Sequence, residues 1–223
     1  MLKKCIFVFY LTTINLIVMN KILTSLLLLI SVWMIPSSAH AQKMKVISGK
    51  FDFLKDQKEL NVQFDYEGLQ LYNENKSEAQ YVSERIQEIS TNKGQDEAEV
   101  WKKDWEYSKS TSFVDKFIAS MNKNLNNIQC VKNNNAKYTI IVQTYWIYPG
   151  WFAGVMAQAA KVSTKLIFVE TANPSNVLLT IDSEKAPGNI SFVGVPNNND
   201  RIAEGYAKTG KSLANMINKK VKK

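Results

Sequence analysis

The segment Gly205–Ser212 (GYAKTGKS) fits G-x-x-x-x-G-K-[ST], the pattern of a loop whose backbone N–H groups cradle nucleotide phosphates. Such a loop leaves a strand directly and opens a helix. Here Asp200–Glu204 already fits a helix whose apolar stripe continues through the motif, and only eleven residues follow it. The sequence therefore predicts a coincidental match, with Gly205 and Gly210 allowing close packing on a sheet.

A second pattern combines Ser120–Lys123 (S-x-x-K) with Lys208–Gly210 (K-T-G), two elements of penicillin-binding enzymes. The S-D-N element of those enzymes is missing from the sequence. The K-T-G triplet also falls on a predicted helix, where those enzymes need a strand. We therefore expect no acylation site here.

Carboxylates and a thiol are the remaining groups that could do chemistry. Paired carboxylates can hydrolyse glycosides, but Asp96, Glu97 and Glu99 begin a predicted helix, where acids favour the helix dipole. The segment Asn197–Asp200 offers oxygen ligands without the spaced acids of a calcium loop, so a capping turn is expected. Cys130 has apolar neighbours and no His or CxxC companion, which favours a buried, inert thiol.

The first forty-one residues read as a leader for export. From Met19, the predicted translation start, Lys21 supplies a positive charge and Ile22–Ile35 an apolar run, and Ala39–Ala41 is a small-x-small cleavage site. The sequence thus predicts a signal peptide over 1–41 and Gln42 as the mature N-terminus. An apolar hairpin or an uncleaved anchor is the alternative.

Cleavage would change the counts that bear on chemistry. It removes His40 and Cys5, so the mature chain would have no histidine and Cys130 as its one cysteine. His-ligated metal sites, His-dependent catalysis and an internal disulfide are then excluded. Loss of three lysines lowers the net charge from +8 to +5, and four of the remaining lysines lie in the basic tail 219–223. That pattern indicates a solvated tail, weakly attracted to membrane surfaces, and no nucleic-acid partner.

Periodicity predicts one α/β (α+β) domain over 42–223, a mixed sheet of about four to six strands with helices packed on it. The expected order is β-β-α-α-α-β-β-β-α. A β-hairpin is expected first, Asn173–Asn176 is expected as a turn, and Val100, Trp101 and Trp105 as one helix stripe. The expected strands are 46–54, 60–66, 138–148, 161–171, 177–183 and a short 190–195; the expected helices run from Ser77 to Gly94, 96–108, 112–127 and from Asp200 onward.

The segment Trp146–Ala157 stands out, because four large aromatic residues surround a Pro-Gly turn and small residues follow. If exposed, this loop is an apolar patch for a partner, a subunit or a lipid interface; if buried, it plugs one end of the sheet. The candidate contact residues are Trp146, Tyr148, Pro149, Gly150, Trp151 and Phe152.

The layout also carries a family resemblance over about residues 60–220. The strand near Asp65–Leu69, a helix before Tyr138–Val142, the Pro149–Gly150 turn, the strand Val162–Thr171 and a terminal amphipathic helix follow in order. This resembles bacterial envelope proteins related to the curli secretion channel lipoprotein, to lipoprotein activators of penicillin-binding proteins and to the amino-terminal domain of TolB. The resemblance implies a small α/β domain for assembly or protein contact, without catalysis. The chain departs from it by lacking a lipidated cysteine and by an extra helix over 96–108.

These patterns together predict a non-enzymatic exported domain, periplasmic or associated with the outer envelope and not lipidated. It is expected to act by protein contact or self-association, without cofactor or metal. The alternative is a binder of a small apolar or glycan ligand, with Tyr148, Trp151 and Phe152 as a stacking platform. A hydrolase comes third and would need two carboxylates converging in a cleft.

The coincidental phosphate-loop match gives a direct prediction. Lys211→Ala should leave the fold unchanged, because Lys211 and Lys208 are expected on the solvated side of the last helix. Thermal unfolding followed by circular dichroism checks this. An ATP-induced rise in the melting temperature that the substitution abolishes would contradict it.

Overall fold

The computed structural model describes residues 42–132, 135–153, 156–188 and 198–221. The predicted leader 1–41, the predicted short strand 190–195 and Asn197, the first residue of the expected capping turn, lie outside this part. Within the described residues, no helix is long and apolar enough to cross a bilayer.

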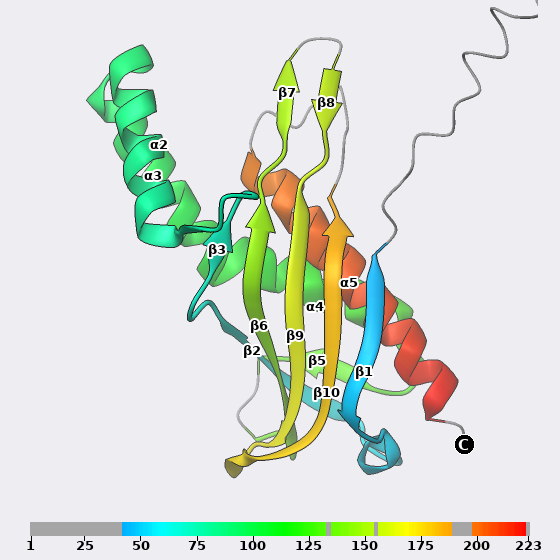
Figure 1. Cartoon of the computed structure of the whole chain (residues 1–223). Helices are drawn as coiled ribbons and strands as arrows, with labels where there is room; N and C mark the ends of the chain where they lie inside the picture. The colour runs from blue at the N-terminus through cyan, green and yellow to red at the C-terminus, as the bar shows by residue number, and fades with distance from the viewer. Residues whose placement is uncertain (1–41, 133–134, 154–155, 189–197, 222–223) are drawn as a thin grey trace, which may run out of the picture. The chain divides into compact units, whose positions relative to one another are not determined.

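A mixed sheet organises the described part of the chain (Figure 1). Its main strands are β1 (Lys43–Gly49), β2 (Glu59–Asp65), β5 (Gln129–Val131), β6 (Tyr138–Tyr148), β9 (Lys161–Glu170) and β10 (Asn173–Pro187). They follow the order β1-β10-β9-β6-β2-β5, and the two-residue strands β3 (Gln70–Leu71) and β4 (Lys76–Ser77) join beside β6. β2 runs parallel to β5 and β6, whereas β6, β9, β10 and β1 pair antiparallel. The predicted mixed sheet is confirmed; within the described residues it has eight strands instead of about four to six, and β3, β4 and β5 were not predicted.

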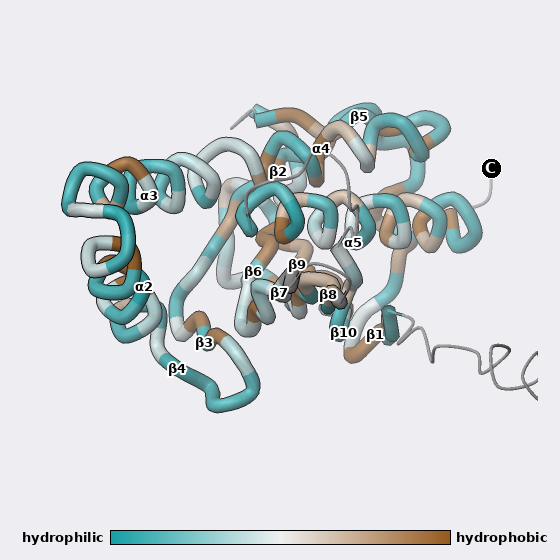
Figure 2. Tube along the Cα trace, turned by 90° about the horizontal axis from the view of Figure 1, so that it is seen from above, coloured by the Kyte–Doolittle hydropathy of each residue, from teal (hydrophilic) through white to brown (hydrophobic). Residues whose placement is uncertain are grey.

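Helices cover one face of this sheet. The described helices are α2 (Glu78–Lys93), α3 (Gln95–Tyr107), α4 (Phe113–Asn124) and α5 (Asn198–Lys220). α4 and α5 lie side by side against the sheet (Figures 1 and 2), and their apolar stripes meet strand residues such as Ile140 and Phe168 in the core. The predicted stripe of α5 is confirmed, since Ile202, Tyr206 and Leu213 are fully buried.

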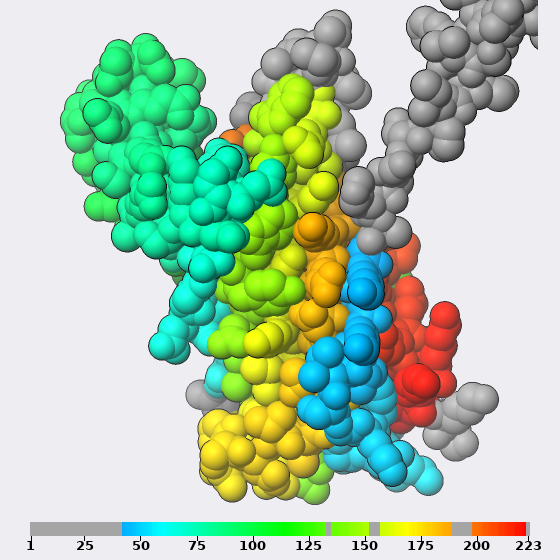
Figure 3. All heavy atoms as spheres, in the orientation of Figure 1, coloured from blue at the N-terminus to red at the C-terminus, as the bar shows by residue number. Residues whose placement is uncertain are grey.

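The opposite face of the sheet, over which none of the described helices lies, carries a row of polar side chains and is turned toward the viewer in Figures 1 and 3. Asp65, Gln143, Lys165, Asp182 and Lys45 stand in register on five neighbouring strands. The Gln143 amide donates to the Asp65 carboxylate at 3.0 Å. A row of polar side chains is compatible with a solvent-exposed face, which antiparallel sheets commonly have.

Gln42 lies directly before β1 and joins two elements of the fold. Its side-chain Nε2 donates to Ser183 Oγ of β10 at 2.8 Å, and Ser212 Oγ of α5 donates to its Oε1 at 2.6 Å. One amide therefore ties the start of β1 to both the sheet and the last helix.

The predicted hairpin of strands 46–54 and 60–66 is wrong. β1 pairs with β10 at one edge of the sheet, whereas β2 lies between β5 and β6. Residues Asp52–Leu54 form a short 3-10 helix, and Phe53 packs on Tyr138 and Phe168 with ring centroids 5.0 and 5.8 Å apart. The apolar residues do alternate over this stretch, but the last of them, Phe53, belongs to the short helix and closes one end of the core.

The turn predicted at Asn173–Asn176 is also wrong. These residues begin β10, and the chain reverses at Thr171 and Ala172 instead, so that Asn173 pairs with Glu170. Pro174 is tolerated because it lies at the exposed start of the strand.

The predicted helix boundaries are confirmed at α2: Ser77 Oγ accepts from the Gln80 backbone N–H, and Gly94 ends the helix at φ 101°. The two helices that follow are joined rather than separate, because Ser108–Ser112 forms a π-helical turn between α3 and α4. Val100, expected on the buried stripe of α3, is 62% exposed, whereas Trp105 is buried. Trp105 and Trp101 are four residues apart and share a helix face that Val100 does not.

Two glycines of the phosphate-loop pattern let α5 approach its neighbours. A Cβ placed on Gly205 would lie 2.8 Å from Val162 Cγ2 of β9, as close packing on the sheet requires. A Cβ placed on Gly210 would lie 2.7 Å from the Phe117 carbonyl oxygen of α4, so this glycine faces a helix rather than the predicted sheet.

We expect Gly210→Ala to destabilise the fold by about 1–2 kcal/mol. The new methyl group must push α4 and α5 apart, and this overpacking exceeds the gain of about 1 kcal/mol in helix propensity. Urea unfolding measures the change, and Asn215→Ala on the exposed side of α5 is the matched control. A Gly210→Ala protein as stable as that control would contradict the close approach.

Candidate functional site

Two residues of the predicted contact loop, Trp146 and Tyr148, lie at the end of β6. A register shift between Thr144 and Trp146 marks a β-bulge, a feature that re-aims the side chains after it. The Trp146 and Tyr148 rings stack with centroids 6.3 Å apart. Trp146 is half-buried, and its indole N–H donates to the Tyr72 carbonyl oxygen at 2.8 Å. Tyr148 is buried, at 9% exposure.

Pro149 and Gly150 turn the chain out of the sheet. Both are buried, and Gly150 has φ 73°. A Cβ on Gly150 would lie 2.4 Å from the Gln158 carbonyl oxygen, so no other residue fits this position without moving the backbone. The Pro-Gly pair therefore sets where the following segment leaves the sheet.

That segment is a two-stranded arm, the β7–β8 arm, formed by β7 (Trp151–Ala153) and β8 (Met156–Gln158). It pairs only with itself in its own small sheet and extends past the end of the main sheet in Figure 1. Phe152 contributes backbone to β7, opposite Ala157. The arm is thus the part of the predicted loop that leaves the core.

Trp151 stands at the root of the arm with 42% of its surface exposed. Its indole N–H donates to Gln158 Oε1 at 3.0 Å, and the Tyr148 hydroxyl donates to the same oxygen at 2.7 Å. Gln158 thereby positions the exposed Trp151 ring beside the buried Tyr148 ring. We call Trp146, Tyr148, Pro149, Gly150 and Trp151 the aromatic base of the arm; sequence reasoning included all five but missed Gln158, whose role depends on a cross-strand register.

A line of rings joins the aromatic base to the helices α2 and α3. Tyr72 contacts Tyr148 edge-on at 5.8 Å and Tyr81 at 5.7 Å, and Tyr81 contacts Trp105 at 5.4 Å. Edge-to-face pairs of this kind stabilise beyond their buried area by about 1 kcal/mol each. The aromatic residues at the base of the β7–β8 arm therefore pack against the same group of rings as helices α2 and α3.

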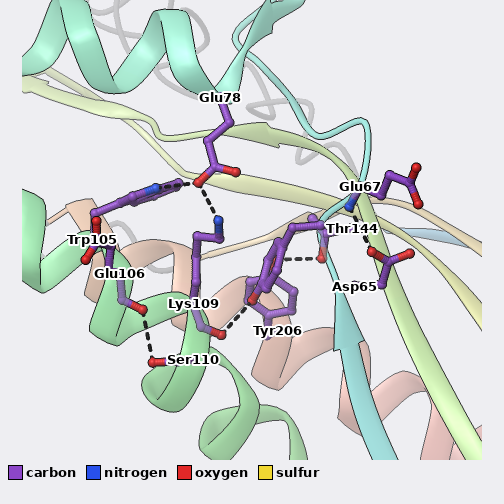
Figure 4. Close-up of polar contacts among 10 residues, drawn as sticks. Asp65, Glu67, Glu78, Trp105, Glu106, Lys109, Ser110, Thr144 and Tyr206 are labelled. Atoms are coloured by element: carbon purple, nitrogen blue, oxygen red, sulfur yellow. Dashed lines mark hydrogen bonds and ion pairs between the residues drawn. The ribbon is translucent and has the colours of Figure 1, made fainter.

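Glu78 is the polar centre of this region (Figure 4). Its Oε1 accepts from the Trp105 indole N–H at 2.8 Å and forms an ion pair with Lys109 Nζ at 2.5 Å. Both charged side chains are about one-quarter exposed, and Lys109, on the π-helical turn, also lies over the Tyr66 ring at 4.8 Å. One carboxylate thus connects the first turn of α2 with α3 and the turn after it.

The partly buried phenol of Tyr66 and the buried phenol of Tyr206 complete this network. The Tyr66 hydroxyl donates to the Lys109 carbonyl oxygen at 3.0 Å, and Tyr206 shares a 2.8 Å hydrogen bond with Thr144 (Figure 4). Burial raises the pKa of both tyrosines above the usual range. The phenols therefore stay neutral and serve as hydrogen-bond partners.

The other residues that the sequence analysis singled out have structural roles. Asp96 and Glu97 occupy the first turn of α3, as expected. Ser120 Oγ donates to the Ala207 carbonyl oxygen at 2.6 Å, joining α4 to α5. Cys130 is buried, and burial raises the pKa of its thiol to about 12. Within the described residues, no group of three or more His, Cys, Asp or Glu side chains could hold a metal ion.

No protein-family model matches the chain, and no curated protein matches its sequence. Among solved structures, a PelC dodecamer from Paraburkholderia phytofirmans is similar over 82% of this chain and 99% of that chain, with 11% identity and a TM-score of 0.38. A variant of the same dodecamer matches over 76% of this chain and 99% of that chain, with 11% identity and a TM-score of 0.33. Likenesses at this level carry no argument about function.

We expect Glu78→Ala to lower the free energy of unfolding by about 1–3 kcal/mol, because the Trp105 N–H and the Lys109 ammonium both lose their acceptor. Glu78→Gln should cost less, since its amide oxygen still accepts from Trp105. Urea unfolding of the two variants measures the difference. Equal stability of Glu78→Ala and the unchanged protein would show that the contacts of the Glu78 carboxylate do not stabilise the fold.

Proposed function

We propose that the chain is a non-enzymatic, exported domain of the cell envelope that acts by protein contact or self-assembly, with the β7–β8 arm as its contact surface. The observation that supports this most is Trp151. Its ring is substantially exposed, yet its indole N–H is held by Gln158 and its neighbours Pro149 and Gly150 are buried. A rigid, exposed tryptophan loses little conformational entropy when a partner covers it, which is why tryptophan is enriched at the centres of protein interfaces.

The export part of the proposal rests on the leader-like sequence before Gln42. The non-enzymatic part rests on composition: once His40 is removed with the leader, the chain has no histidine, and its one cysteine is a buried thiol with a raised pKa. These features favour binding over nucleophilic or acid–base chemistry.

The alternative, a stacking platform for a small apolar or glycan ligand, is favoured less. A platform needs open ring faces, whereas Tyr148 is 9% exposed and packs against both Trp146 and Tyr72. The remaining exposed ring, Trp151, suits a protein surface as well as a sugar.

Trp151→Ser should weaken partner capture or self-association strongly while changing the free energy of unfolding by less than about 1 kcal/mol. Chemical crosslinking in whole cells and sedimentation of the purified protein at 500 mM NaCl, where exposed charge pairs are screened, measure association through the arm. Thermal unfolding measures stability. Val177→Ser, a change at a residue that is 50% exposed on β10, is the matched control.

Unchanged association of the Trp151→Ser protein would exclude the arm as the contact surface. A large loss of stability would instead assign Trp151 to the core. Either result overturns the proposal in its present form.

A further inference from the structure

Helix α3 exposes two large apolar side chains, with the charged residues Lys103 and Asp104 between them. Val100 is 62% exposed and Tyr107 59% exposed, and their separation of seven residues places them on the same side of the helix. Trp105, between them in sequence, is buried on the other side. This side of α3 therefore offers apolar contact area interspersed with charge, so any partner must match its charges as well.

A groove of about 480 Å³ lies beside this face, between α2 and α3. Ile89, Val100 and Trp101 give it an apolar lining. Its charged lining residues are Glu88, Glu97 and Asp104 together with Arg85 and Lys93, so carboxylates outnumber cations by one. An apolar trough with a negative group is the environment that suits a lysine side chain, whose methylenes bury while its ammonium reaches a carboxylate.

The two helices α2 and α3 together are acidic. Residues 78–107 contain eight acidic and four basic side chains, a net charge of −4. Asp96, Glu97 and Glu99 gather where the two helices join and take part in no ion pair with any described residue. The helix dipole accounts for acids in the first turn, such as Asp96 and Glu97, but not for Glu99.

The helical layer formed by α4 and α5 has the opposite charge. These two helices contain seven basic and three acidic residues, a net charge of +4. Lys116 is paired with Glu204 at 2.6 Å, whereas Lys123, Lys208 and Lys211 are exposed and form no ion pair within the described part. Lys208 and Lys211 lie on one side of α5, away from its buried stripe.

We propose that the acidic helices α2 and α3 of one molecule dock on the basic α4–α5 layer of a second copy. Lys208 and Lys211 of the second copy would enter the groove, with their methylenes on Val100 and Trp101 and an ammonium group near Glu97, while Glu99 outside the groove adds negative charge to α3. Because the two surfaces differ, a docked pair leaves the basic layer of the first copy and the acidic helices of the second copy free, and the contact is heterologous. The contact uses neither the β7–β8 arm nor Trp151, so it stands apart from the proposed partner surface.

A charge-exchange experiment tests this contact. One variant carries Glu97→Lys with Glu99→Lys, and a second carries Lys208→Glu with Lys211→Glu. Lys55→Glu with Lys58→Glu, both exposed in the loop before β2, changes the net charge as the second variant does and serves as the control. Sedimentation equilibrium at 50 mM and 500 mM NaCl gives the self-association constant of each, and circular dichroism confirms that each is folded.

Each reversed variant alone should self-associate at least about tenfold more weakly than the unchanged protein, because like charges then face each other. An equimolar mixture of the two should recover the association, because each reversed surface now meets its complement. The charge-dependent part of the self-association should be lost at 500 mM NaCl, since salt screens exposed charges. Trp151→Ser should leave the difference in association between 50 mM and 500 mM NaCl intact, which separates a failure here from a failure of the arm.

An unchanged protein that is monomeric at both salt concentrations would overturn the proposal, and so would a mixture that fails to recover association. An equal loss in the Lys55/Lys58 control would show that net charge, and not this surface, controls association. If Lys208→Glu with Lys211→Glu fails to fold, Lys208→Gln with Lys211→Gln removes the charges without reversing them and should weaken association in the same direction.

Discussion

The position of the helices α2 and α3 depends on one carboxylate. Glu78 accepts from an indole N–H on α3 and pairs with an ammonium on the turn after it, so a single oxygen connects three parts of the chain. Because both charges are partly withdrawn from water, their attraction is largely offset by lost hydration. The contact mainly contributes geometry. It places Trp105 and Lys109 against the first turn of α2, and so helps to align the aromatic rings between these helices and the arm.

The π-helical turn at Ser108–Ser112 is the second constraint. It carries α3 into α4 without a break and lets Trp105 and Phe113 both face the core, with ring centroids 6.2 Å apart. Phe113 in turn stacks on Tyr206 of α5 at 5.0 Å. A run of aromatic contacts therefore links the helices that leave the sheet to the helices that cover it.

Local signals predicted the elements whose causes are local. The β-branched and aromatic run over 138–148 is β6 itself, and Ser77 and Gly94 bound α2 because capping involves only neighbouring residues. Pairing is not local: Val46 and Val62 carry the same alternation, yet they lie on strands separated by three others. The aromatic residues of the base were found from their types, whereas Gln158 and Glu78 were missed because their roles arise from distant partners brought together by folding.

The hydrogen bonds of Gln42 have a consequence for the chemistry of the mature end. An N-terminal glutamine can cyclise when its α-amine attacks its own side-chain amide carbon and ammonia leaves. If the leader is removed after Ala41, the hydrogen bonds to Ser183 and Ser212 hold the side-chain amide in one orientation. The side chain must turn toward the α-amine, and the Nε2 bond to Ser183 must break, before ammonia can leave. The fold would therefore slow formation of a blocked pyroglutamyl end and preserve a free, positively charged amine beside the sheet.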